Sequence, residues 1–127
     1  MNFLYEEHKE NFEKVMNIGH YYNEDVGYNR AMLLLSLPFI FPKYEKGFYN
    51  YSEGGSPLDI VFDTLMSDRD SRKIDLTGSM VLISKLALNL FNGFEEVSIY
   101  SILSSCEEKY IQVVVDAIQL KKSDLYV

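Results

Sequence analysis

The stretch GSMVLISKLALNLFN, residues 78–92, is apolar around most of its circumference when it is drawn as a helix. Its polar residues Lys85, Asn89 and Asn92 are spaced four and three apart, so they form one narrow strip. Asn92 and Gly93 are residues that commonly end a helix in a left-handed conformation. The stretch therefore predicts a central apolar helix over 78–92, with other helices wrapped around it.

The first two helices are expected within residues 5–37. Apolar residues recur at helical spacing from about residue 5 to residue 18, and Gly19 stands where a cap would end that helix. A second helix is expected over about 24–37, because its last turns are apolar nearly all round and Pro38 disfavours continuation.

Three further helices are expected, one before the central helix and two after it. One begins at Pro57 with Ser56 as its N-cap, and the charged segment 67–75 after it is expected to be a loop. A short helix over about 98–104 and a last helix over about 107–122 follow the central helix.

The segment 38–56 is the least regular part of the sequence. It contains Pro42 and Gly47 and ends near Gly54 and Gly55, so we expect a loop with one or two short extended pieces. The whole sequence thus predicts an all-α domain over 1–127. We expect a compact bundle of five or six helices around 78–92, with the aromatic segment 38–56 covering one end.

Composition excludes several classes of function. The chain has 127 residues, of which 47% are hydrophobic, and its net charge is −7. This size and composition suffice for one core without disulfides or metal. A negative chain is poorly suited to nucleic acid or to anionic lipid, since both attract lysine and arginine. We therefore expect a protein partner with a basic surface, although simple solubility also explains the acidity.

The sequence also indicates a location. Cys106 is the one cysteine, which is typical of a reducing compartment. The opening MNFLYEEHKE lacks the basic and then apolar pattern of a signal peptide. The longest apolar run, 32–41, is too short to cross a bilayer. We expect a cytoplasmic protein.

No motif predicts catalysis, a cofactor or a metal. His8 follows two glutamates, but Phe12 stands where a zinc protease needs its second histidine. Asp68, Asp70 and Asp75 are interleaved with basic residues, so surface ion pairing is a simpler interpretation than calcium binding. A small hydrolase-like enzyme assembled by folding from His8, Cys106 and Asp116 stays open as an alternative.

The aromatic residues of the middle segment are the best functional candidates. Tyrosine and phenylalanine are enriched at binding hot spots, and loops often carry binding residues. The alternative is that these rings pin the segment onto the bundle. The residues expected to contact a partner, with acidic residues at the rim, are Tyr44, Glu45, Phe48, Tyr49, Tyr51 and Glu53.

Three stretches covering roughly half of the chain resemble a family of small proteins of unknown function from Gram-positive bacteria and their phages. The family opens with an apolar–EEH–x3–F segment, has a motif like LAFNLYNG, and carries an Ala–Ile pair in its last helix. The matching residues here are Phe3, Leu4, Glu6, Glu7, His8, Phe12, Leu86, Ala87, Asn89, Leu90, Asn92, Gly93, Ala117 and Ile118. The middle, 38–77, departs from that pattern.

The resemblance implies a phage or mobile-element context, and no functional residue comes with it. We expect a non-enzymatic interaction module, in that context an inhibitor of a bacterial defence or regulatory protein. A homo-oligomeric structural module is the second interpretation, in which an exposed apolar face closes on a second copy.

Overall fold

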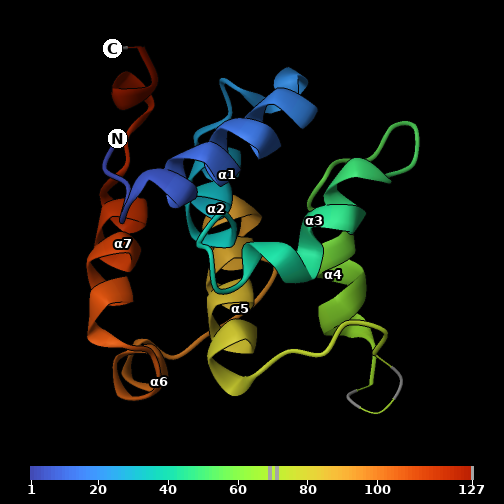
Figure 1. Cartoon of the computed structure of the whole chain (residues 1–127), viewed down its shortest axis with the longest axis vertical. Coiled ribbons are helices and arrows are strands. Elements are labelled where there is room, and N and C mark those ends of the chain that lie inside the picture. The colour runs from blue at the N-terminus through green and yellow to red at the C-terminus, as the bar shows by residue number, and fades with distance from the viewer. Residues whose placement is uncertain (69, 71, 127) are drawn as a thin grey trace.

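The computed structural model describes residues 1–68, 70 and 72–126 (Figure 1). The α-helices are α1 Glu6–Ile18, α2 Val26–Leu35, α3 Phe41–Tyr49, α4 Asp59–Met66, α5 Gly78–Asn92, α6 Ile99–Ser105 and α7 Glu108–Gln119. The 3₁₀ helices η1 His20–Tyr22 and η3 Lys122–Tyr126 follow α1 and α7, respectively. The described residues contain no strand, which confirms the all-α class.

Helix α2 lies at the centre of the bundle. Every side chain from Ala31 to Leu37 is buried, and α2 packs against α1, α5 and α7. The expected central helix, α5, is instead the main neighbour of α2. The two helices approach closely at Gly27, where a Cβ would lie 2.5 Å from the carbonyl oxygen of Phe91. The structure therefore corrects the expectation that α5 is the central helix. One side of α5 is only half-buried, whereas α2 is covered by other helices on several of its sides.

Side-chain caps mark where α2, α5 and α6 begin. The side chain of Asp25 accepts a hydrogen bond from the Tyr28 amide at 2.9 Å, at the start of α2. Thr77 does the same for α5 and Ser98 for α6, as is typical of N-cap residues. Gly93 ends α5 at φ 75°, in the left-handed region that glycine adopts without steric cost.

The segment expected to be a loop contains helix α3. Pro42 lies in its first turn, where the missing amide hydrogen leaves no intrahelical bond unmade. Its buried side chains, Phe41, Tyr44 and Phe48, recur at helical spacing. A Cβ on Gly47 would collide with the side chain of Ile60 in α4, so this glycine permits a close α3–α4 contact. The expectation was wrong because it treated Gly47 as a turn residue.

The remaining boundaries differ by a few residues. Helix α4 begins at Asp59 and not at Pro57, because Ser56 and Asp59 first form a tight turn. In it, Ser56 Oγ accepts from the Leu58 amide and Asp59 accepts from the Ser56 amide, both at 3.2 Å. Helix α7 ends at Gln119, and Lys122 already belongs to η3.

The helices form a bundle that is longest along the vertical axis of Figure 1. Helices α3 and α4 pack as a pair on one side of α5, and α7 packs on the other side of α2. Helix α1 crosses at one end and α6 lies at the opposite end. Within the described part of the chain, no helix combines the length and the apolar character needed to cross a membrane.

Candidate functional site

Two of the aromatic residues expected at a contact surface lie in the core. The side chains of Tyr44 and Phe48 are fully buried, and the Tyr44 hydroxyl lies 2.8 Å from Ser84 Oγ of α5. Burial raises the pKa of Tyr44 to about 12, and the hydrogen bond with Ser84 opposes this rise. These rings hold α3 onto the bundle, so they offer no surface to a partner.

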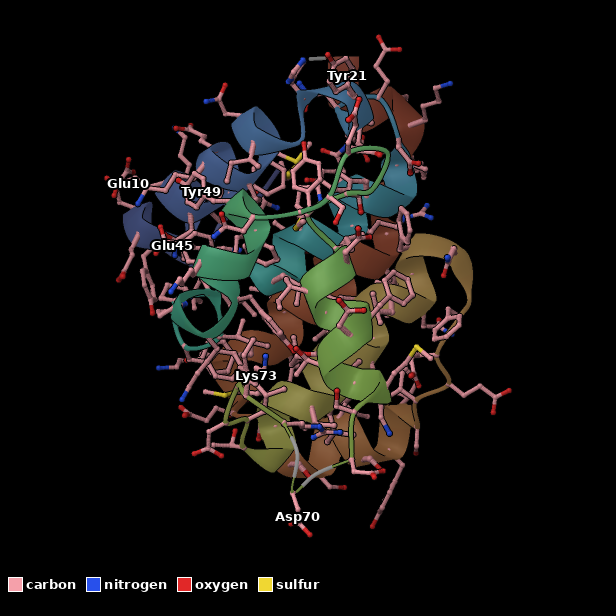
Figure 2. All side chains as sticks on the ribbon, turned by 90° about the vertical axis from the view of Figure 1, so that its right-hand side faces the viewer. Glu10, Tyr21, Glu45, Tyr49, Asp70 and Lys73 are labelled. Carbon is pink, nitrogen blue, oxygen red and sulfur yellow. The ribbon has the colours of Figure 1, made fainter. Side chains whose placement is uncertain are left out.

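The other expected contact residues lie at or near the surface, around the junction of α1 and α3. Tyr49 is 54% exposed, and Glu45 is half-buried with one oxygen 3.9 Å from Lys14 Nζ. Figure 2 shows Tyr49 and Glu45 on the same side of the molecule as Glu10 of α1. The Tyr49 ring and the carboxylates of Glu45 and Glu10 therefore lie on one side of the molecule.

Tyr51 and Glu53 lie in the turn between α3 and α4. The Tyr51 hydroxyl donates to the carbonyl of Ile18 at 3.4 Å, which leaves its ring half-buried against the end of α1. The Tyr22 hydroxyl fixes the same turn by donating to Gly55 at 2.9 Å. Glu53 is exposed. Tyr51 thus tethers the turn, whereas the Tyr49 ring is open to solvent.

Helix α6 carries an apolar face that the sequence pattern did not single out. Ile99, Tyr100 and Leu103 are 50%, 79% and 58% exposed, whereas Ile102 is fully buried. Positions 99, 100 and 103 fall within an arc of about 100° on a helix of 3.6 residues per turn. The three exposed side chains therefore form one outward surface, which we call the α6 face.

Contacts on the buried side of α6 and at both ends of this helix fix the position of the α6 face. Ile102 belongs to the core cluster, and α6 packs against α5. The Ser79 hydroxyl of α5 donates to the carbonyl of Ser105 at 2.9 Å, and Ser98 caps the first turn. A helix of seven residues is marginal by itself in water, so these contacts set its position. The apolar side chains are presented on a fixed support.

Acidic residues border the α6 face. Glu95 and Glu96 precede the helix, and Glu107 and Glu108 follow it. Of these, Glu96, Glu107 and Glu108 are exposed. Lys109 lies near them, with its Nζ 3.7 Å from a carboxylate oxygen of Glu107.

A hollow of about 1000 Å³ lies beside α6. Ser101 and Ser105 line it from α6, and Leu76, Val81 and Leu82 contribute apolar side chains from α5 and the segment before it. Arg72, Lys73 and Asp75 also line this hollow. Ser101 and Ser105 point away from Ile99, Tyr100 and Leu103 on a helix of 3.6 residues per turn, so the hollow lies on another side of α6 from the α6 face.

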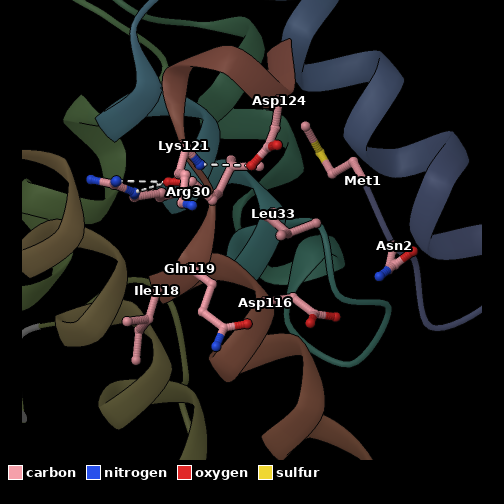
Figure 3. A pocket seen from close by; sticks show the side chains of 10 residues that line it. Met1, Asn2, Arg30, Leu33, Asp116, Ile118, Gln119, Lys121 and Asp124 are labelled. Carbon is pink, nitrogen blue, oxygen red and sulfur yellow. Dashed lines mark hydrogen bonds between the residues drawn. The ribbon is translucent and has the colours of Figure 1, made fainter. Parts of the chain in front are cut away.

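A second hollow, of about 740 Å³, lies between α2, α7 and η3 (Figure 3). There Arg30 donates from Nε and from one terminal nitrogen to the Leu120 carbonyl, at 2.9 and 2.7 Å. A cation at the last carbonyls of a helix is stabilising, so Arg30 caps α7. Beside it, the Lys121 amide donates to Asp124 at 2.8 Å. These hydrogen bonds fix the position of the segment that follows α7.

The residues of the enzyme alternative are not brought together. His8 is buried on α1, while Cys106 follows α6 at the opposite end of the bundle (Figure 1). Burial raises the pKa of the Cys106 thiol, which disfavours its nucleophilic thiolate form. Asp116 accepts a hydrogen bond from Gln112 at 2.9 Å.

Comparison with known proteins found no matching family model, no matching curated protein and no matching solved structure.

The signal for the α6 face was present in the sequence. Residues 99–103 read Ile-Tyr-Ser-Ile-Leu, which is more apolar surface than one side of a short helix can bury. Periodicity alone did not say which of these side chains face the core, because two overlapping apolar stripes fit the segment.

Proposed function

We propose that this protein is a non-enzymatic interaction module of the cytoplasm that binds another protein through the α6 face. The observation that carries the proposal is the exposure of Ile99, Tyr100 and Leu103 side by side on an anchored helix. The partner expected from the resemblance is a bacterial defence or regulatory protein, which the module inhibits by covering its surface.

Physical chemistry supports this assignment. Fully burying one large apolar side chain contributes about 1.5–3 kcal/mol, so covering three that are each at least half exposed gives a substantial driving force. Tyrosine is enriched among residues that dominate binding energy. Because α6 is already anchored, little conformational entropy is lost when a partner binds.

The surface at the α1–α3 junction is a smaller candidate within the same function. Tyr49 is its exposed ring, and Glu10, Glu45 and Glu53 are its acidic residues. Its apolar area comes from one side chain, so we assign it a secondary role at the edge of a larger interface.

Site-specific photocrosslinking tests the proposal in the native cell. A photoreactive phenylalanine derivative replaces Tyr100 in one variant and Leu103 in a second. Tyr21 is the matched control, because it is an 83% exposed tyrosine near the opposite end of the bundle. We expect a discrete polypeptide adduct of one mass from positions 100 and 103.

The outcomes separate the hypotheses clearly. Adducts that are absent, or that are the same from position 21, contradict a protein-binding role for the α6 face. An adduct with twice the mass of the chain identifies the homo-oligomeric module instead. Adducts from position 49 and none from position 100 move the interface to the α1–α3 junction.

A further inference from the structure

We propose that the segment seated on the α6 face is a basic amphipathic stretch of a partner polypeptide. Its apolar side chains cover Ile99, Tyr100 and Leu103, and its lysine or arginine side chains meet the carboxylates at both ends of α6. This inference rests on the proposed function and adds the chemistry of the partner to it.

The chain segment that contains α6 carries a net negative charge. Between residues 93 and 109 the chain has four glutamates and one lysine, so the formal charge is −4 + 1 = −3. The one lysine, Lys109, lies 3.7 Å from Glu107, so part of its field is already compensated locally. A partner that approaches this face meets a net negative rim.

The acidic residues stand close to both ends of α6 in the chain, since Glu96 lies two residues before the N-cap Ser98 and Glu107 lies two residues after Ser105. Seven helical residues rise about 10 Å, so both ends of α6 lie within about 5 Å, along its axis, of its middle. The Debye length at physiological salt is about 8 Å, so charges placed over these ends feel the carboxylates with little screening. Charge complementarity therefore favours a basic rim on the partner.

The same charges disfavour a second copy of this chain. In a two-fold pairing the same patch meets itself, so Glu95 and Glu96 of one copy approach the acidic ends of the other. Such a pairing brings together eight glutamates, four from each copy, and only the two Lys109 side chains of this segment compensate them. Anionic lipid is disfavoured by the same repulsion.

The hollow beside α6 lies on another side of this helix from the α6 face. Its apolar part, from Leu76, Val81 and Leu82, lies beside the serines of α6. We therefore assign the contact to the α6 face and to the acidic residues near its ends.

The absence of tryptophan from the sequence makes a direct assay simple. The probe is a synthetic amphipathic helical peptide about five turns long, with one tryptophan on its apolar face and lysines along both edges. The matched peptide has glutamates in place of the lysines. We expect tryptophan emission to shift to the blue when the lysine peptide is added to the full chain, and to stay unchanged for the glutamate peptide.

Variants locate the binding. Tyr100→Ser combined with Leu103→Ser is expected to weaken the lysine peptide at least about tenfold. The control, Tyr21→Ser, is expected to leave binding unchanged. Glu96→Gln combined with Glu107→Gln is expected to weaken binding about threefold to tenfold and to flatten its salt dependence. Glu24→Gln, which changes an exposed glutamate after η1, is the control for the double glutamate variant.

Four results would overturn the inference. They are equal binding of both peptides, no binding of the lysine peptide, unchanged binding by the Tyr100–Leu103 variant, and a dimer in light scattering that this variant abolishes. The first three leave the proposed function standing if positions 100 and 103 still crosslink to a protein. Loss of those crosslinks removes the proposed function itself.

Discussion

The Nε2 atom of His8 lies 2.7 Å from the carbonyl oxygen of Leu33, inside the contact between α1 and α2. The other ring nitrogen, Nδ1, accepts a hydrogen bond from the Leu4 amide at 3.0 Å. Because Nδ1 accepts, Nε2 must carry the proton, so the fold selects one neutral tautomer. The His8 ring also packs against the Phe3 ring in a T-shaped arrangement, with centroids 5.2 Å apart. His8 thus joins the N-terminal residues to the central helix.

This geometry makes stability depend on pH. Burial lowers the pKa of His8 below 6.5, and the bond to Leu33 opposes that shift. A lowered folded-state pKa gives stability that is fully present above the unfolded value and is lost as pH falls. We expect the free energy of unfolding to decrease below pH 6.5, with a slope of at most about 1.4 kcal/mol per pH unit from this group.

Urea denaturation at several pH values between 7 and 5 measures this dependence. The His8→Gln variant is expected to flatten the slope, since it has no imidazole to protonate. His20→Gln, at an exposed position, should keep the wild-type slope. An unchanged slope in His8→Gln would assign the pH dependence to other groups.

The buried bond between Tyr44 and Ser84 joins α3 to α5. Tyr44→Phe should lower the free energy of unfolding by about 1 kcal/mol, because the Ser84 hydroxyl loses its tyrosine partner. Ser84→Ala should cost about 1–3 kcal/mol for the orphaned tyrosine hydroxyl. The double variant should cost less than the sum of the two, since no hydroxyl is then left unpaired. Strict additivity in denaturation experiments would mean that the two hydroxyls do not interact.

Gly27 tests the close approach of α2 and α5. Alanine in a helix normally stabilises relative to glycine by about 0.5–1 kcal/mol. At Gly27 the added Cβ meets the carbonyl oxygen of Phe91, so we expect a loss of about 1–3 kcal/mol. Gly78→Ala is the matched control at the start of α5, where a Cβ has no neighbour within 4 Å. Thermal unfolding of both variants gives the comparison, and equal effects would contradict the close contact between the two helices.

Helix α6 should respond very differently on its two sides. Ile102→Ala should destabilise by about 2–4 kcal/mol, because its side chain is part of the core. Tyr100→Ser and Leu103→Ser should each change the free energy of unfolding by less than about 0.5 kcal/mol. A large loss from the serine variants would show that this face is covered within the chain.

The same contrast applies to α3. Phe48→Ala should cost about 3–5 kcal/mol, since the ring is fully buried. Tyr49→Ala, one residue later, should leave thermal stability nearly unchanged, and it should weaken partner binding if the α1–α3 junction lies at the edge of the interface. A Tyr49 variant as unstable as the Phe48 variant would place that ring in the core.

The candidate site shows the limit of composition as a guide. Tyr44, Phe48 and Tyr49 were equally good candidates from residue type, because aromatic rings serve both cores and interfaces. Their burial separates them, and it follows from the helical register of α3. That register was missed because Gly47 was interpreted as a turn signal.

The sequence by itself determined the helical class and the bounds of α5, because these depend on local features. The period of the apolar residues, the polar strip through Lys85 and the Asn92–Gly93 ending all act within a few turns of the chain. Only the tertiary structure decided that α2 is the hub, that Gly47 lies in a helix and that the α6 face is open. Each of these depends on which distant segment supplies the neighbouring surface, as Ile60 does for Gly47. Burial is a property of such pairs of segments, and a local pattern does not contain it.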